Sequence, residues 1–149
     1  MPEISFYQLT STALEKALPA LLDRIVSSNM KALVLAKSEA QIKALDESIW
    51  TYSSPKFLPH TTVDNEDVDE HPIFLTREEV NPIAAEVLVA VEGLEPAYIA
   101  QFDRVVDMFD GRVEAELAGA RQRWKRYKDA GHSVTYWQQE ANGAWKKAA

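Results

Sequence analysis

The spacing of apolar and polar positions predicts alternating strands and helices in the first part of the chain. Residues 4–9 have the composition of a strand, and Thr12 with Glu15 has the spacing of a capping box that opens a helix. Apolar residues then recur at helical spacing between residues 14 and 25. Pro19 lies inside this pattern, which predicts either a kink or a later start of the helix.

A second strand and a second helix follow. Residues 31–36 form a nearly uninterrupted apolar run, which is typical of a strand buried on both faces of a parallel sheet. Ile42, Leu45 and Ile49 return to the helical period within residues 38–50. This order of strand, helix, strand and helix predicts a three-layer α/β domain.

The middle of the chain has less periodicity. Residues 51–71 contain prolines, serines and acidic residues, so we predict a long surface loop that includes the acidic stretch 61–71. A short helix is predicted at residues 96–101. Short apolar runs predict three further strands, at residues 72–76, 86–91 and 104–109.

The last quarter of the chain predicts a helix and a hairpin. The helix is expected from about residue 112 to residue 130, with Gly131 in position to terminate it in a left-handed conformation. Residues 134–138 and 144–145 are separated by Asn142 and Gly143, a strong hairpin signal. A short antiparallel ribbon is therefore expected at the end of the chain.

Length and composition indicate one domain. The chain has 149 residues and 46% hydrophobic content, enough for one buried core and too little for two ordinary domains, so residues 1–149 are predicted to form a single domain. The absence of cysteine excludes disulfides and thiolate metal sites. No secretory signal pattern is visible, and the longest apolar run is far below the roughly 20 residues of a membrane span. A cytoplasmic protein with no membrane contact is the default expectation.

Charge is distributed unevenly along the sequence. Residues 60–111 hold thirteen Asp and Glu against two Arg, a net of −11, whereas residues 112–149 hold eight Lys and Arg against four Asp and Glu, a net of +4. The whole chain carries −7. Proteins that grip a nucleic-acid backbone along their length are usually basic overall. We therefore expect this chain to be repelled by such a backbone except through its last quarter.

The sequence shows few signals of a nucleotide or metal site. The sequence contains neither GxGxxG after the first strand nor GxxxxGK[ST], and it has only five glycines. Asp107 and Asp110 resemble half of a metal-phosphate site, although strand-end acids that cap the next helix are commoner. His60, His71 and His132 lie in separate segments without metal-ligand spacing. We therefore predict no cofactor and no metal.

No catalytic constellation is recognisable either. The chain has no GxSxG elbow and no cysteine nucleophile. His60 is expected to be a hydrogen-bonded structural histidine at a loop end rather than a catalytic one.

The basic helix is the most informative feature of the sequence. Arg121, Trp124, Lys125 and Lys128 have spacings that place them on one helix face, where they form a cationic stripe around one large ring. Such a surface suits an acidic peptide with an apolar anchor. The alternative is an ordinary solvated face, in which Trp124 or Tyr127 packs onto the sheet. The sequence leaves open which of these two rings lines a pocket.

Several segments together resemble the chi subunit of bacterial DNA polymerase III, an accessory protein of the clamp loader. The segments that carry the resemblance are residues 6–7, 45–52, 57–60, 121–128 and 136–138. The resemblance spans nearly the whole chain and is weakest in the acidic middle. It implies a Rossmann-like α/β fold with a mostly parallel sheet and without nucleotide binding, which agrees with the missing glycine loop.

The resemblance also implies a function. Chi proteins bind the acidic C-terminal tail of the single-stranded-DNA-binding protein and link it to the clamp loader, so a non-catalytic subunit with an indirect association with DNA is expected. Arg121 matches a family arginine that pairs with the terminal carboxylate, Trp124 replaces a family tyrosine, and Lys125 matches a neighbouring lysine. Arg123 and Lys128 are added from helical spacing and net charge. Leu117 stands where enteric members carry a lysine, which predicts a weaker electrostatic attraction of the acidic tail.

A second family partner is psi, a small helical protein that bridges chi to the rest of the clamp loader. Trp50, Tyr52 and Phe57 are candidate aromatic residues for that partner or for the clamp loader itself. The alternative is that Trp50 closes the core of the helix at residues 38–50.

Two other functions remain as alternatives. One is weak binding of single-stranded nucleic acid, with Trp124, Trp137 and Trp145 as stacking platforms. The other is an unrecognised α/β enzyme, for which Asp107, Asp110 and His60 are the first mutational targets.

Overall fold

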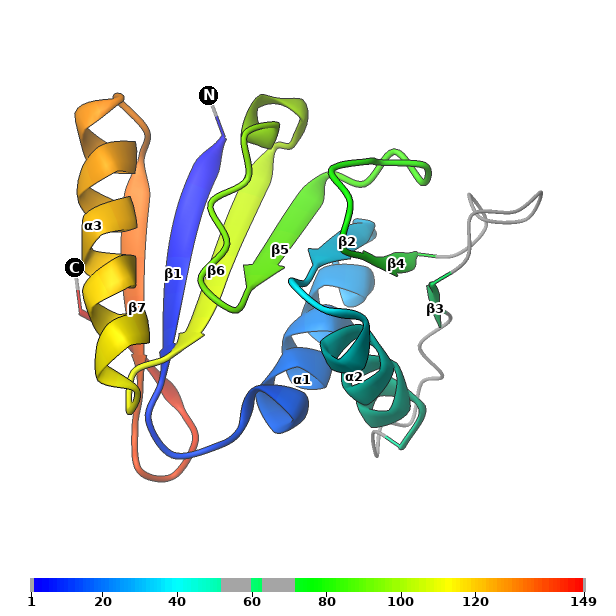
Figure 1. Cartoon of the computed structure of the whole chain (residues 1–149), viewed down its shortest axis with the longest axis horizontal. Helices are drawn as coiled ribbons and strands as arrows, with labels where there is room; N and C mark the ends of the chain where they lie inside the picture. Colours follow the sequence, from blue (N-terminus) through cyan, green and yellow to red (C-terminus); the bar gives the residue numbers. More distant parts are fainter. Residues whose placement is uncertain (1, 52–59, 63–71, 149) are drawn as a thin grey trace.

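The computed structural model describes residues 2–51, 60–62 and 72–148 (Figure 1). Tyr52, Phe57, His71 and the acidic stretch 63–71 lie outside the described residues, so the predictions that concern them stay predictions. The described residues also show that residues 51–71 are not loop throughout. His60–Thr61 forms a short strand, β3, that pairs in parallel with the neighbouring strand β4.

One mostly parallel sheet organises the described residues. Its eight strands lie in the order β3-β4-β2-β5-β6-β1-β7-β8, and only the β7–β8 pair is antiparallel. Besides β3, the strands are β1 (Glu3–Leu9), β2 (Ala32–Leu35), β4 (Ile73–Thr76), β5 (Val87–Val91), β6 (Arg104–Asp110), β7 (Val134–Gln139) and β8 (Trp145–Lys147).

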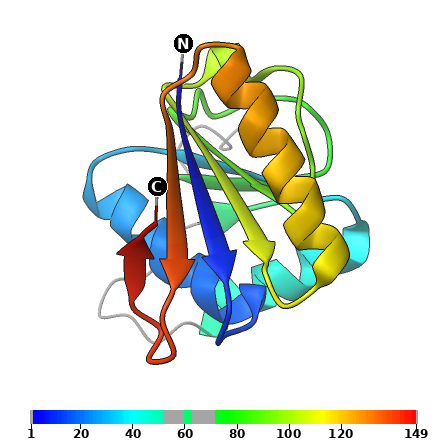
Figure 2. The same cartoon turned by 90° about the vertical axis from the view of Figure 1, so that its left-hand side faces the viewer.

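Helices cover both faces of this sheet. Figure 2 shows α3 (Glu114–Asp129) on one side and α1 (Leu14–Ser27) on the other. Helix α2 (Glu39–Thr51) packs beside α1, and both contribute to the same core cluster. The cluster on the opposite face includes buried residues of α3. The prediction of a three-layer, Rossmann-like α/β fold is confirmed.

The two cores follow from the alternation of side chains along the strands. In β1, Ile4 and Phe6 belong to the core on the α3 side, whereas Leu9 belongs to the core on the α1 side. All four residues of β2 are buried, and this strand lies between β4 and β5. The apolar run at residues 31–36 is therefore a strand buried on both faces, as predicted.

The start of α1 corrects one prediction. The N-cap residue is Ala13, and it makes no capping bond through its side chain, so the predicted capping box of Thr12 and Glu15 is absent. Instead, the backbone N–H groups of residues 10, 11 and 12 all donate to Oε1 of Gln139, at 3.0–3.2 Å. The Gln139 amide in turn donates to the hydroxyl of Thr12 at 2.8 Å. A side chain of β7, far away in the sequence, thus accepts the hydrogen bonds of the backbone N–H groups in the turn before α1. Pro19 lies inside α1 and does not delay its start.

The end of α3 and the C-terminal hairpin form as the sequence predicts. Gly131, just after α3, has a φ of 94°, the left-handed conformation expected of a terminator. The β7–β8 hairpin turns through Gly143, which also has a positive φ, and the N–H of Gly143 donates to the carbonyl of Glu140 at 2.9 Å. The helix predicted at residues 96–101 is a single 3-10 turn, Ile99–Gln101.

Candidate functional site

A groove opens between α3 and the β7 side of the sheet. It has a volume of ≈ 580 Å³ and is lined by Arg121, Trp124 and Lys125 of α3, Gln8 of β1, and Tyr136 and Gln138 of β7. We call it the α3–β7 groove. Three of the residues predicted to bind a partner peptide therefore line one hollow. They were selected from their helical spacing and from the family resemblance.

The packing of α3 decides which ring faces the groove. Tyr127 is only 6% exposed, and its ring lies 6.1 Å from that of Phe6 in the core. Burial raises the pKa of the Tyr127 hydroxyl far above its usual value. Trp124 is partly buried and lines the groove. Of the two rings left open by the sequence, Trp124 is therefore the groove residue and Tyr127 the core anchor.

The groove is cationic. Arg121, Lys125 and Lys128 are all exposed, and Nζ of Lys128 lies 4.5 Å from the centroid of the Trp124 ring, in cation–π geometry. No acidic side chain belongs to the set of described residues that line the groove. An anion that enters therefore meets positive charge next to an aromatic wall.

Strands β1 and β7 supply the polar floor. Their parallel register places Tyr136 beside Phe6 and Gln138 beside Gln8, and the Tyr136 hydroxyl donates to Oε1 of Gln8. The rings of Tyr136 and Phe6 stack at 6.2 Å, with an interplanar angle of 12°. The floor residues that line the groove are Gln8, Tyr136 and Gln138, and none of them was predicted as a site residue from the sequence. Only the pairing of the first strand with the last long one, 128 residues later, brings them together.

Arg123 does not belong to this groove, which corrects its prediction as a peptide-binding residue. Arg123 is 4% exposed, and its side chain is buried between α3 and the sheet. Its guanidinium donates two hydrogen bonds to Asp107 of β6: Nε to Oδ2 at 2.6 Å and Nη2 to Oδ1 at 3.0 Å. Burial raises the pKa of Asp107, and the bonds from Arg123 oppose that rise. Leu117, the departure from the enteric pattern, packs against the same core and is partly buried.

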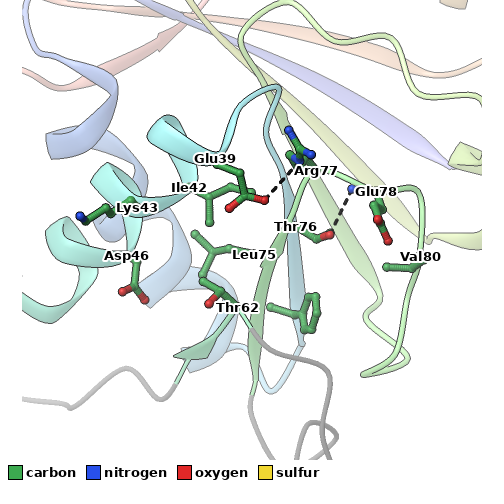
Figure 3. Close-up of a pocket in the computed structure, with 11 residues that line it drawn as sticks. Glu39, Ile42, Lys43, Asp46, Thr62, Leu75, Thr76, Arg77, Glu78 and Val80 are labelled. Atoms are coloured by element: carbon green, nitrogen blue, oxygen red, sulfur yellow. Dashed lines mark hydrogen bonds and ion pairs between the residues drawn. The ribbon is translucent and has the colours of Figure 1, made fainter.

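A second hollow of ≈ 550 Å³ lies near the opposite edge of the sheet, between α2 and the end of β4 (Figure 3). We call it the α2–β4 hollow. Its charged residues have both signs, and Figure 3 shows Glu39 of α2 reaching Arg77, with 3.2 Å between Oε1 and Nε. The charged lining residues are Glu39, Lys43, Asp46, Arg77 and Glu78.

Trp50 lies at the end of α2, and 58% of its surface is exposed. The alternative that Trp50 closes the core is therefore wrong, because Leu45 and Ile49 fill that role. The ring of Trp50 lies 4.7 Å from that of His60. Nε2 of the buried His60 is 2.9 Å from Oδ1 of Asp46, which fits the predicted structural histidine.

The residues singled out for an enzyme do not meet. Asp107 and Asp110 alternate along β6, so they point to opposite faces of the sheet. Asp110 accepts bonds from the backbone and side chain of Arg112, which lower its pKa, and its side chain does not cap α3. His60 lies in β3, at the far edge of the sheet.

Of the three tryptophans considered for nucleic-acid stacking, Trp124 lies apart from the other two. Trp124 faces the α3–β7 groove, whereas Trp145 packs with Tyr7 against the core on the α1 side. Tyr7 lies between Trp137, at 6.2 Å, and Trp145, at 5.0 Å, measured between ring centroids. The three tryptophans therefore do not form one platform, because Trp124 is separate from the cluster around Tyr7.

The described residues show neither a membrane-spanning helix nor a metal cluster. None of their helices combines the length and apolar character needed to cross a bilayer. Within the same residues, no group of three or more His, Asp or Glu side chains is arranged to hold a metal ion.

Fold and groove together define a Rossmann-like α/β protein with a cationic groove and an aromatic wall at one side of its sheet. Comparison with known proteins gives the family. The family model described as DNA polymerase III chi subunit, HolC, matches residues 1–135. The chain therefore belongs to the DNA polymerase III chi subunit family, which is an accessory part of that polymerase assembly.

A curated relative supports this assignment. The chain is 30% identical over 109 residues to a protein of Rickettsia prowazekii (strain Madrid E) named "Probable DNA polymerase III subunit chi". The match covers 73% of this chain and 66% of the length of that relative.

Proposed function

We propose that this chain is a non-catalytic subunit that tethers the clamp-loader assembly to the single-stranded-DNA-binding protein, by holding that protein's acidic C-terminal tail in the α3–β7 groove. The observation that carries the proposal is the convergence of Arg121, Trp124 and Lys125 on one open hollow. Family membership supports the general role, and the groove chemistry supports the partner.

The chemistry of such a tail fits the groove. A planar guanidinium binds a terminal carboxylate with two parallel hydrogen bonds, and this is the role proposed for Arg121. The terminal aromatic side chain packs against Trp124, which is already partly buried and needs little ordering. Lys125 and Lys128 attract the acidic residues that precede the terminus and accelerate encounter.

The second partner, psi or the clamp loader itself, is proposed to bind the other end of the molecule. Trp50 is a large, exposed apolar side chain near the edge formed by β3 and β4, whereas the α3–β7 groove lies near the edge formed by β7 and β8. Two partners can therefore bind at the same time, as a tether requires. Tyr52 and Phe57 remain predictions for this surface.

Calorimetric titration with a synthetic peptide ending in Asp-Asp-Ile-Pro-Phe tests the tail-binding proposal. We expect micromolar binding to the wild type and a loss of at least about tenfold in affinity for Arg121→Ala, because a charge-assisted bond contributes about 1.5–3 kcal/mol. Lys16→Ala is the matched control, since it removes one exposed positive charge from α1 on the opposite face.

Two results would count against the proposal. A folded wild-type protein that does not bind the peptide removes the tail as the partner. Equal losses in Arg121→Ala and Lys16→Ala show that net charge, and not this groove, drives the binding.

A further inference from the structure

Helix α3 has few apolar anchors for the position it holds. Three of its residues are buried: Ala120, Arg123 and Tyr127. Of these, only Tyr127 supplies a large apolar surface. Arg123 is placed where an amphipathic helix ordinarily has an aliphatic side chain.

The Arg123 guanidinium is bound on several sides. Beyond its two bonds to Asp107, Nη1 donates to the carbonyl of Gly93 at 3.3 Å. This links α3 to β6 and to the turn after β5. A planar fork that binds a carboxylate at two points sets an angle as well as a distance, which an aliphatic contact does not.

One of the two glycines beside this guanidinium, Gly119, leaves room for it. A Cβ atom added at Gly119, one turn earlier in α3, would lie 3.2 Å from Nη1 of Arg123, and one added at Gly93 would lie 3.6 Å from the same atom. The first distance is tighter than ordinary van der Waals contact. Glycine costs helix stability in the interior of α3, so its presence beside Arg123 is consistent with a space requirement.

Arg123 lies behind the groove residues. At 100° per residue, Arg121 and Lys125 are each about 160° around the helix from Arg123. A rotation of α3 about its axis would therefore move the groove residues and the buried guanidinium in opposite directions. Fixing the guanidinium at the back fixes the direction of the charges at the front.

We infer that the buried Asp107–Arg123 pair is a positioning element that sets the rotation of α3 on the sheet and thereby the geometry of the α3–β7 groove. As far as it concerns peptide binding, this inference rests on the proposed function. The pair does not touch the peptide. It acts through Arg121, Trp124 and Lys125.

The test separates positioning from stability. Breaking one partner alone leaves a buried uncompensated charge, whereas replacing both by apolar residues of similar size is often neutral or stabilising. The informative variant is therefore Asp107→Leu/Arg123→Met. We expect it to fold with a melting temperature close to that of the wild type, and to bind the Asp-Asp-Ile-Pro-Phe peptide about tenfold more weakly.

Residual dipolar couplings of the α3 amides provide a readout without ligand. They report the direction of each N–H vector relative to the sheet, and we expect the α3 vectors of the double variant to be reoriented or more widely distributed than those of the wild type. Arg123→Lys keeps the charge and loses the fork, so it should show a smaller change in both measurements.

Leu22→Ala is the control for stability alone. Leu22 is fully buried in α1 on the opposite face, and its truncation lowers the melting temperature without touching α3. We expect its peptide affinity and α3 couplings to be unchanged at a temperature where it is folded.

Unchanged couplings in the double variant overturn the positioning role, and so does an unchanged affinity where the wild type binds. If the wild type does not bind the peptide, the proposed function fails, while the couplings still decide whether the pair orients α3.

Discussion

The two hollows have nearly equal volumes, ≈ 580 Å³ for the α3–β7 groove and ≈ 550 Å³ for the α2–β4 hollow, but different chemistry. The groove has cationic residues, an indole wall and a hydrogen-bonded polar floor. The hollow has acidic and basic residues together, and its Arg77 already contacts Glu39. Arg121 has no ion-pair partner within the described part of the chain.

The comparison shows that volume does not identify a binding site for an anion. A guanidinium that already has a carboxylate partner attracts a second carboxylate less strongly, because its charge is partly compensated, whereas an unpaired one keeps its full charge. The large ring also differs in place, since Trp124 is a wall of its groove and Trp50 is not among the residues that line the other hollow.

The largest expected effect concerns a buried ion pair beneath α3, compared with the exposed pair in the α2–β4 hollow. Asp107→Leu alone is expected to destabilise the protein by about 3–5 kcal/mol, because it leaves Arg123 buried without its partner. Arg77→Ala removes an exposed pair and should change stability by less than about 0.5 kcal/mol. Urea denaturation measures both, and equal effects would contradict the assignment of one pair as buried and structural.

A smaller effect is expected from a matched exchange of tryptophans. Trp124→Ala should weaken binding of the tail peptide by about tenfold or more, because a buried aromatic anchor at an interface typically contributes about 2 kcal/mol. Trp50→Ala should leave the peptide affinity unchanged. Calorimetry compares the two variants, and the reverse order of effects would transfer the tail site to the α2 side.

Salt should weaken peptide binding if the cationic residues of the α3–β7 groove attract the peptide. Raising the ionic strength from low to physiological levels should weaken peptide binding severalfold, because exposed charges are screened over about 8–10 Å. Lys125→Gln should bind more weakly at low salt and show a shallower salt dependence. If the salt dependence of this variant equals that of the wild type, Lys125 does not contribute to the encounter.

The smallest effect concerns an exposed pair outside both hollows. Hydrogen bonds from Arg112 lower the pKa of Asp110, so the resulting stabilisation is present at neutral pH and is lost as the pH falls through that lowered pKa. Arg112→Ala should raise the pKa of Asp110 towards its ordinary value. A carboxyl ¹³C NMR titration measures this, and an unchanged pKa in the variant would show that the pair does not form in solution.

Elements and local signals were predictable because periodicity is local. The strand at residues 31–36 and the left-handed Gly131 needed only their neighbours in sequence. The start of α1 was not predictable, since Gln139 supplies the acceptor from the other end of the chain.

The candidate site divides in the same way. Helical spacing and the family resemblance placed Arg121, Trp124 and Lys125 on one face of α3, and the structure shows all three lining one groove. The same spacing gives no reason for the side chain of Arg123 to be buried between α3 and the sheet. Its partner Asp107 lies on a different element, and charge alone does not show that the two residues meet. Tyr136 and Gln8 become groove residues only through the β1–β7 register.

One measurement tests the central claim most directly: two-dimensional ¹H–¹⁵N NMR of the four tryptophan indoles during titration with the Asp-Asp-Ile-Pro-Phe peptide. The four indoles give separate signals in a single spectrum: Trp50 and Trp124 report on two different surfaces, whereas Trp137 and Trp145 both lie beside Tyr7. If the tail binds the α3–β7 groove, the Trp124 signal shifts with peptide concentration and the other three stay in place. A shift of Trp50 without a shift of Trp124, or no shift at saturating peptide, would contradict the account.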